Sequence, residues 1–301
     1  GSEPDLVKNL TPQLPPVPWE YLLVQGFETW PFNGFDASWS RDGKQIAFFA
    51  RINRDHALVI IDADTGEVLR KIELESGELK LNQAFSPSFN IDGSAVIFSA
   101  VNNITRDLYR IDVKNGNITN LTKDERFDTA PAVSSNGKKV AYVSLVGDFQ
   151  HLFLLDIENG EKEQLTFGRF NDSSPSWSDD GSTLVYTSDE ADMIWNIYTL
   201  DVATRTVKQW TEFMGEVKTP LFTRGSLTTV YYVVFRDDDQ FRDSIYPNYE
   251  IFAAELKKPI RQYVSVDNKE PLNFAFNPNR DLFKLDLDAN QLLNQTEPSE
   301  Q

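Results

Sequence analysis

The sequence contains no cysteine and only two histidines among its 301 residues. Without cysteine the chain can form no disulfide bond, carries no thiolate nucleophile and cannot build a cysteine-rich zinc or iron–sulfur site. Two histidines are too few for a histidine-rich metal site. No run of about 18 apolar residues is present, so no segment is expected to span a membrane.

Three signatures of catalysis and nucleotide binding are also missing. The chain has no G-x-S-x-G nucleophile motif, no Walker motif and no G-x-G-x-x-G fingerprint. Its net charge is −17, whereas a nucleic-acid-binding protein normally carries a basic surface that neutralises phosphates. We therefore expect no nucleic-acid partner, and anionic membrane surfaces are disfavoured for the same reason.

What the chain does contain is a repeat. Five turn glycines follow one another at spacings of 50, 44, 44 and 44 residues: Gly43, Gly93, Gly137, Gly181 and Gly225. The first four belong to Asp-Gly or Asn-Gly pairs, which predict tight hairpins in which both central residues have positive φ. A second marker is an apolar strand that ends on an acid, found at Asp62, Asp112, Asp156, Asp201, Glu255 and Asp286.

Each unit of about 44 residues has room for four short strands, a length typical of one blade of a β-propeller. The sequence thus predicts an all-β fold, a six-bladed β-propeller of four-stranded antiparallel blades that spans residues 19–296. The last unit, Pro271–Thr296, is too short for four strands. We expect the N-terminal run Trp19–Gly26 to complete it, so that pairing of the N- and C-terminal segments closes the propeller.

The two ends of the chain differ in composition from the repeat. Residues 1–18 contain five prolines, which indicates a linker or extended arm, and the opening Gly-Ser resembles the remnant of an expression tag. Residues 297–301 form a polar tail.

The segments "SPSFNIDG" and "SPSWSDDG", each followed by an apolar strand and an aromatic-x-x-Asp strand, resemble the repeat of TolB-like propellers. The resemblance covers about Phe35 to Thr296. It implies the propeller fold and a bacterial periplasmic or secreted location. It leaves function open, because the same repeat serves as a protein-binding platform in TolB and as a substrate gate in prolyl-oligopeptidase-type enzymes.

Loop lengths indicate which face of the propeller binds a ligand. We name the strands of a blade a to d from the innermost outward. The a–b and c–d turns are short and uniform, whereas the b–c loops vary and the longest is Arg236–Asn248. Variable loops on a uniform scaffold usually carry function. The predicted ligand-binding aromatic residues on this face are Phe149, Trp195, Phe241 and Tyr246.

The blade connections place acids and arginines on the same face. Asp36, Asp128 and Asp172 each precede an a strand, with Arg126 and Arg169 beside them, and we expect the acids to approach the mouth of the channel. There they could bind a cation or a basic peptide. Alternatively, they accept backbone N–H bonds at the strand starts.

Two further features have a structural explanation as well as a functional one. Asp237, Asp239 and Asp243 in the longest loop could hold calcium, although a solvated charge run explains them as well. His151 occupies the polar position that begins the c strand in every blade, which favours a strand-edge residue over a catalytic base. No cofactor is otherwise expected.

The residues favour a scaffold rather than an enzyme. The first hypothesis is a non-enzymatic, monomeric propeller that binds a protein, peptide or other ligand on its loop-rich face. The second is the non-catalytic propeller domain of a larger prolyl-oligopeptidase-type peptidase. A third hypothesis is a propeller enzyme that acts on a glycan with Asp128 and Asp172 as its acids.

Overall fold

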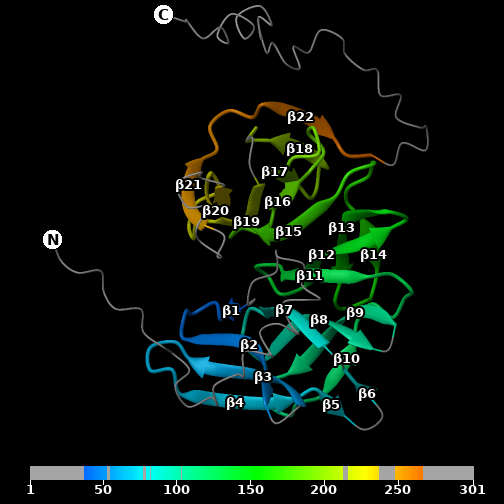
Figure 1. Cartoon of the computed structure of the whole chain (residues 1–301), viewed down its shortest axis with the longest axis vertical. Coiled ribbons are helices and arrows are strands. Elements are labelled where there is room, and N and C mark those ends of the chain that lie inside the picture. Colours follow the sequence, from blue (N-terminus) through cyan, green and yellow to red (C-terminus); the bar gives the residue numbers. More distant parts are fainter. Residues whose placement is uncertain are drawn as a thin grey trace, which may run out of the picture. The chain divides into compact units, whose positions relative to one another are not determined.

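The computed structural model describes residues 37–266, apart from 53–54, 77–78, 82, 103, 213–215 and 237–247. In that part of the chain strands are the only regular secondary structure, and no helix there could cross a membrane. The strands form five antiparallel sheets, numbered here as blades one to five in chain order, and one small hairpin (Figure 1).

The first three blades each contain four strands in the order of the chain. Blade one consists of β1 (Ala37–Trp39), β2 (Gln45–Ile52), β3 (Asp55–Asp62) and β4 (Val68–Glu73). The hairpin follows with β5 (Glu75–Ser76) and β6 (Leu79–Lys80). Blade two consists of β7 (Gln83–Phe89), β8 (Ala95–Asn102), β9 (Thr105–Asp112) and β10 (Ile118–Asn120). Blade three consists of β11 (Asp128–Val133), β12 (Lys139–Val146), β13 (Phe149–Asp156) and β14 (Lys162–Gln164).

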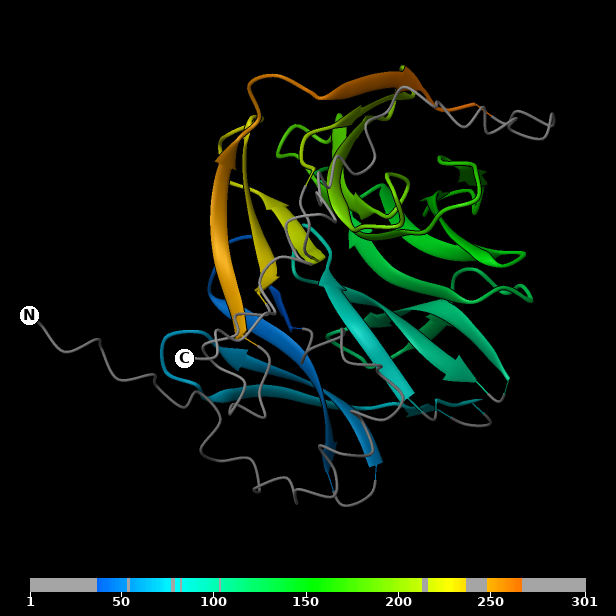
Figure 2. The same cartoon turned by 45° about the horizontal axis from the view of Figure 1, so that its top comes forward.

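Blades four and five depart from the four-strand prediction. Blade four consists of β15 (Asp172–Trp177), β16 (Thr183–Ser188), β17 (Asn196–Asp201), β18 (Thr206–Gln209) and, as a fifth strand, β22 (Arg261–Val264). Blade five keeps only β19 (Glu216–Phe222), β20 (Thr229–Arg236) and β21 (Asn248–Glu255). Figure 1 and Figure 2 show β22 lying along β18 instead of β21.

Side-chain contacts explain why β22 joins blade four. The ring of Tyr263 packs against the apolar cluster between blades three and four, and its hydroxyl donates to Glu190 Oε2 at 2.5 Å. The guanidinium of Arg261 lies 2.9 Å from the same carboxylate oxygen. These two contacts join β22 to the loop after β16.

The number of blades differs from the prediction. The described residues form five blades where six were predicted. The segments expected to make and close the sixth, Pro271–Thr296 and Trp19–Gly26, lie outside the described residues.

Both repeat markers are confirmed within the described blades. The strands β3, β9, β13, β17 and β21 end on the five acids that the pattern names between Asp62 and Glu255. All five a–b turn glycines have positive φ, between 70° and 78°. The turn type, however, was predicted wrongly, because the Asp or Asn before each of the first four glycines does not have positive φ.

Those turn acids act through their side chains. In blade four, Asp180 Oδ1 accepts a hydrogen bond from the hydroxyl of Ser178 at 2.6 Å and from the amide of Ser182 at 3.0 Å. The hydroxyl of Ser178 in turn accepts from the amide of Thr183 at 3.0 Å. A wider turn closed by side chains therefore replaces the two-residue hairpin, and only its glycine needs the left-handed conformation.

The core lies between the blades. Along β12, Val140 and Tyr142 pack against blade two, whereas Ala141 and Val143 pack against blade four. Because successive strand residues point to opposite faces, a sheet between two neighbours must be apolar at every position. This explains why the b strands read as continuous runs of β-branched and aromatic residues rather than as an alternating pattern.

Hydrogen bonds supplement this packing between neighbouring a strands. The hydroxyl of Ser38 accepts from the amide of Phe89 at 3.1 Å, and the hydroxyl of Ser88 accepts from the amide of Val133 at 3.1 Å. Between blades three and four, the indole N–H of Trp177 donates to the carbonyl oxygen of Ala132 at 2.9 Å.

The Trp177 bond gives a stability prediction. Replacing Trp177 by Phe keeps an aromatic ring but removes the donor, which leaves the Ala132 carbonyl without this partner. We expect the free energy of unfolding to fall by about 1–2 kcal/mol in urea denaturation. Trp39→Phe is the matched control, because Trp39 ends the a strand of blade one and is 58% exposed. An equal loss in both variants would contradict the inter-blade role.

Candidate functional site

The b–c turns and the blade connections lie at the same end of the blades, as predicted. Phe127, in the connection between blades two and three, forms a parallel bridge with Arg106, which follows the b–c turn of blade two. Its carbonyl oxygen accepts from the amide of Leu145, just before the b–c turn of blade three, at 3.2 Å. One connection thus contacts the loop ends of both flanking blades.

Apart from Asp128 and Asp172, the predicted residues on this face fall into three groups. Arg126 and Arg169 are exposed, and the guanidinium of Arg126 lies 5.1 Å from the centre of the Phe153 ring. Phe149 and Trp195 are half-buried. The remaining predicted site residues lie outside the described residues: Asp36, Asp237, Asp239, Phe241, Asp243 and Tyr246.

Contrary to the prediction, Asp128 and Asp172 do not line a channel mouth, because both are completely buried. Each begins an a strand just before a β-bulge, at Thr129–Ala132 in β11 and Ser173–Ser176 in β15. A bulge adds a residue to one strand and re-aims the side chains beside it. The acids lie at the junctions between blades, where a c strand, the end of a d strand and the next a strand meet.

The junction between blades three and four shows the arrangement most completely. The hydroxyl of Thr166 accepts from the amide of Leu152 at 2.9 Å and donates to Asp172 Oδ2 at 2.5 Å. His151 Nδ1 lies 3.6 Å from the same carboxylate oxygen, and the imidazole meets the Phe170 ring edge-on. Burial raises the pKa of Asp172, against the lowering effect of His151, Thr166 and Ser188. His151 is thus a buried partner of an acid rather than a strand-edge residue.

The junction between blades four and five is neutral. The hydroxyl of Thr211 accepts from the amide of Ile197 at 2.8 Å and donates to Asn196 Oδ1 at 2.9 Å. Asn196 occupies the position of His151, and Val217 occupies the position of Asp172. Neither residue is a carboxylate, so no negative charge is buried at these two positions.

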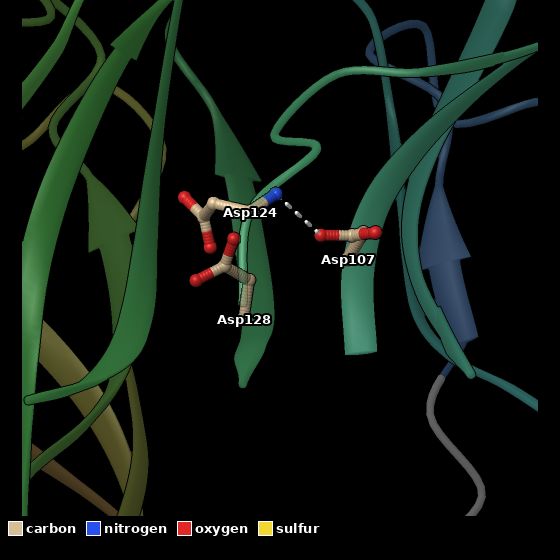
Figure 3. A group of neighbouring side chains, drawn as sticks. All are labelled: Asp107, Asp124 and Asp128. Atoms are coloured by element: carbon tan, nitrogen blue, oxygen red, sulfur yellow. Dashed lines mark hydrogen bonds between the residues drawn. The ribbon is translucent and has the colours of Figure 1, made fainter. Parts of the chain in front are cut away.

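The junction between blades two and three is acidic. Asp107 takes the position of His151; it accepts from the hydroxyl of Thr122 at 3.2 Å and from the amide of Asp124 at 3.3 Å. Burial raises the pKa of Asp128 to about 6; the hydroxyls of Ser144 and Thr122 oppose this shift, and the charges of Asp124 and Asp107 add to it. Three carboxylates, Asp107, Asp124 and Asp128, meet at this point (Figure 3).

Sequence reasoning missed the threonines and Asp124. The signal was present, because Thr122, Thr166 and Thr211 recur at 44 and 45 residues, at the end of each outer strand. The same spacing relates Asp107, His151 and Asn196. What the pattern did not reveal was that these two series meet in space.

These observations define a class: an all-β protein built from propeller blades, with polar junctions and a loop-rich face. A family model of the TolB β-propeller domain matches residues 35–212, more than half of the chain. The chain therefore belongs to the TolB β-propeller family. No curated protein matches the sequence.

Several solved structures share the fold. TolB from Acinetobacter baumannii is 20% identical with a TM-score of 0.54, and the match covers 75% of this chain and 56% of that protein. A putative TolB from Agrobacterium tumefaciens is 16% identical with a TM-score of 0.60, covering 78% and 83%. An oligogalacturonate lyase from Vibrio parahaemolyticus is 15% identical with a TM-score of 0.54, covering 77% and 66%. At these identities the likeness shows the fold alone.

The buried Asp172 gives a pH prediction. Its raised pKa means that the native state binds this proton more tightly than the unfolded chain does. The resulting stabilisation is lost as the pH rises from the ordinary carboxyl value of 3.8 through the raised native value. We therefore expect the stability of the wild type, measured relative to Asp172→Asn, to fall as the pH rises above the ordinary carboxyl value of 3.8.

His151 faces Asp172 directly, and Tyr186 and Glu190 interact with it electrostatically. All three remain in both proteins of the comparison. Asp92→Asn is the control of opposite sign, because hydrogen bonds from Ser94 lower the pKa of Asp92. The stability of the wild type, measured relative to Asp92→Asn, should therefore increase as the pH rises. Parallel curves for Asp172→Asn and Asp92→Asn in urea denaturation at each pH would contradict the assignment.

Proposed function

We propose that the chain is a non-enzymatic, monomeric TolB-type propeller that binds a protein or peptide on the face formed by the b–c turns and blade connections. The observation that carries this proposal is a set of exposed apolar side chains at the loop ends. Met193 is 88% exposed in the loop of blade four, and Ile104 is 85% exposed in the turn of blade two. Phe127 and Val146 are exposed between them in the chain, on the same loop face.

Exposed apolar side chains at loop tips are typical of surfaces that bind other proteins. Arg126 and Arg169 add positive charge to this face of an acidic chain. A partner that offers apolar side chains beside carboxylates would complement it, because guanidinium groups bind carboxylates well. The half-buried rings of Phe149 and Trp195 would line the floor of such a site.

The complete propeller in this proposal has six blades and spans residues 19–296. An exposed apolar face on blade five is the argument for a sixth blade. Leu221, Tyr231 and Ile251 share the face turned away from blade four, and all three are exposed, Ile251 by 77%. We expect Pro271–Thr296, together with Trp19–Gly26, to form the sixth blade. Membership of the TolB family favours a bacterial periplasmic or secreted location.

The second candidate is the propeller domain of a larger peptidase. A prolyl endopeptidase structure shares the fold with a TM-score of 0.50 and 16% identity, and the match covers 34% of that protein. A hydrolase segment with a G-x-S-x-G motif in the same gene product would favour this candidate. The glycan-acting hypothesis is not carried forward, because Asp128 and Asp172 are buried and cannot contact a sugar.

The binding proposal predicts a loss of partner binding on substitution of the loop tips. Replacing Ile104, Phe127 and Met193 by Ser removes the apolar contacts without touching the core. We expect a partner captured from an extract of the source organism to be lost, and its Kd, measured with the purified partner, to rise at least tenfold, about 1.4 kcal/mol.

The matched control replaces Ile91 and Leu227 by Ser. Both are exposed apolar residues in a–b turns, at the opposite end of the blades. This variant should bind the partner as the wild type does. Equal affinities of the wild type and the loop-tip variant would refute the proposed surface, and equal losses in both variants would show unspecific adsorption.

A further inference from the structure

Among the described residues, the junction between blades two and three gathers an unusual set of acids. Asp107, Asp124 and Asp128 each offer a carboxylate oxygen, and these atoms lie within 4.8 Å of one another. Figure 3 shows the carboxylates of Asp124 and Asp128 facing each other, with Asp107 on the other side of the Asp124 backbone. At the next junction, His151 and Gly168 take the positions of Asp107 and Asp124.

Several buried oxygen atoms of this junction lack a hydrogen-bond partner, although both carboxylate oxygens of Asp107 accept hydrogen bonds. Neither carboxylate oxygen of Asp128 makes a hydrogen bond of normal geometry, and neither do the hydroxyls of Ser144 and Tyr142. The hydroxyls of Ser144 and Thr122 lie near enough to Asp128 to lower its pKa, but they do not outweigh its burial. Ser144 lies directly opposite Asp128 in the pairing of β11 with β12, and Tyr142 is two residues away on the same face of β12. Four buried polar oxygens without partners are costly, and such groups usually indicate an ion or ordered water.

The nearest ammonium group does not compensate Asp128. Lys162 Nζ lies 2.7 Å from Asp124 Oδ2 and 2.5 Å from the carbonyl oxygen of Thr122. Both contacts are on the part-exposed side of the cluster. At the equivalent junction, Asp172 Oδ2 accepts a hydrogen bond from the hydroxyl of Thr166 and lies 3.6 Å from His151 Nδ1, so only its Oδ1 lacks a partner, whereas Asp128 lacks a partner at both oxygens.

We propose that Asp107, Asp124 and Asp128 bind a divalent cation of the calcium type between blades two and three. The donors are all oxygen atoms, which hard cations prefer over nitrogen or sulfur. Ligands on a calcium ion lie at about 2.3–2.6 Å from it, so opposite ligands are up to about 5 Å apart. The observed separation fits this range. Calcium also accepts irregular geometry and water ligands, which the part-exposed side of Asp124 can admit.

The ion would join a strand of blade two to the connection that leads into blade three and to the first strand of blade three. Asp107 belongs to β9, Asp128 begins β11, and Asp124 lies in the connection between the two blades. Arg126 and Phe127 lie between Asp124 and Asp128 and are exposed on the loop-rich face. Ion binding would therefore hold this connection in place for a partner. This last consequence rests on the proposed function, whereas ion binding itself does not.

The test is thermal unfolding of the purified chain after treatment with EDTA and dialysis. Calcium chloride is added to 5 mM, and sodium chloride at equal ionic strength serves as the reference. We expect the Tm of the wild type to rise by roughly 5 °C when calcium reaches about 100 times its Kd. Asp128→Asn should abolish the rise. Asp124→Asn, a change at a part-exposed residue that preserves the fold, should weaken calcium binding in titration calorimetry by at least about tenfold.

Two control variants show whether the calcium response comes from this junction. Asp172→Asn alters the equivalent acid at the next junction and should keep the full calcium response. The triple variant Asp237→Asn, Asp239→Asn, Asp243→Asn alters the acidic loop and should also keep it. The proposal is overturned if calcium, magnesium and manganese all leave the wild-type Tm unchanged. It is equally overturned if the response survives in Asp128→Asn and disappears in the loop variant.

Discussion

The structure depends on one constraint: every inner blade must bury both faces of its sheet. A single blade cannot do this alone, since a sheet with two apolar faces needs a neighbour on each side. The alternation along β12, with Val140 and Tyr142 on one face and Ala141 and Val143 on the other, meets this requirement. The four apolar clusters between successive blades follow from it, and so does the exposed apolar face of blade five.

The same constraint creates the polar junctions. When two sheets pack face to face, the strand ends near the loops are buried together with the apolar residues. Their free amides and carboxylates must then find partners inside the protein. The threonine at the end of each outer strand serves this need, since its hydroxyl accepts a backbone N–H and donates to a neighbouring side chain. At the three described junctions a different side chain receives that bond: Asp107, Asp172 or Asn196.

The blades could be predicted from the sequence because the repeated residues determine the local backbone geometry at turns and strand ends. Turn glycines and acids such as Asp112 and Asp156 mark strand ends through short-range chemistry, so their positions were predicted to the residue. The junctions and β22 were not predictable in this way. Asp172 and His151 are 21 residues apart, and β22 pairs with a strand more than 50 residues earlier. Such contacts depend on how sheets stack, which no local pattern encodes.

The attachment of β22 to β18 also affects the order in which the protein can assemble during synthesis. Blades one to three receive their last strand within a few residues of the preceding one, so each can complete its hydrogen bonding as soon as it leaves the ribosome. Blade four cannot, because its outermost strand is made only after all of blade five. Until residue 264 emerges, β18 has an unpaired outer edge, and Glu190 has neither Arg261 nor Tyr263 as a partner. Blade four can therefore complete its hydrogen bonding only after blade five has been made, whereas each of the first three blades can do so as it emerges.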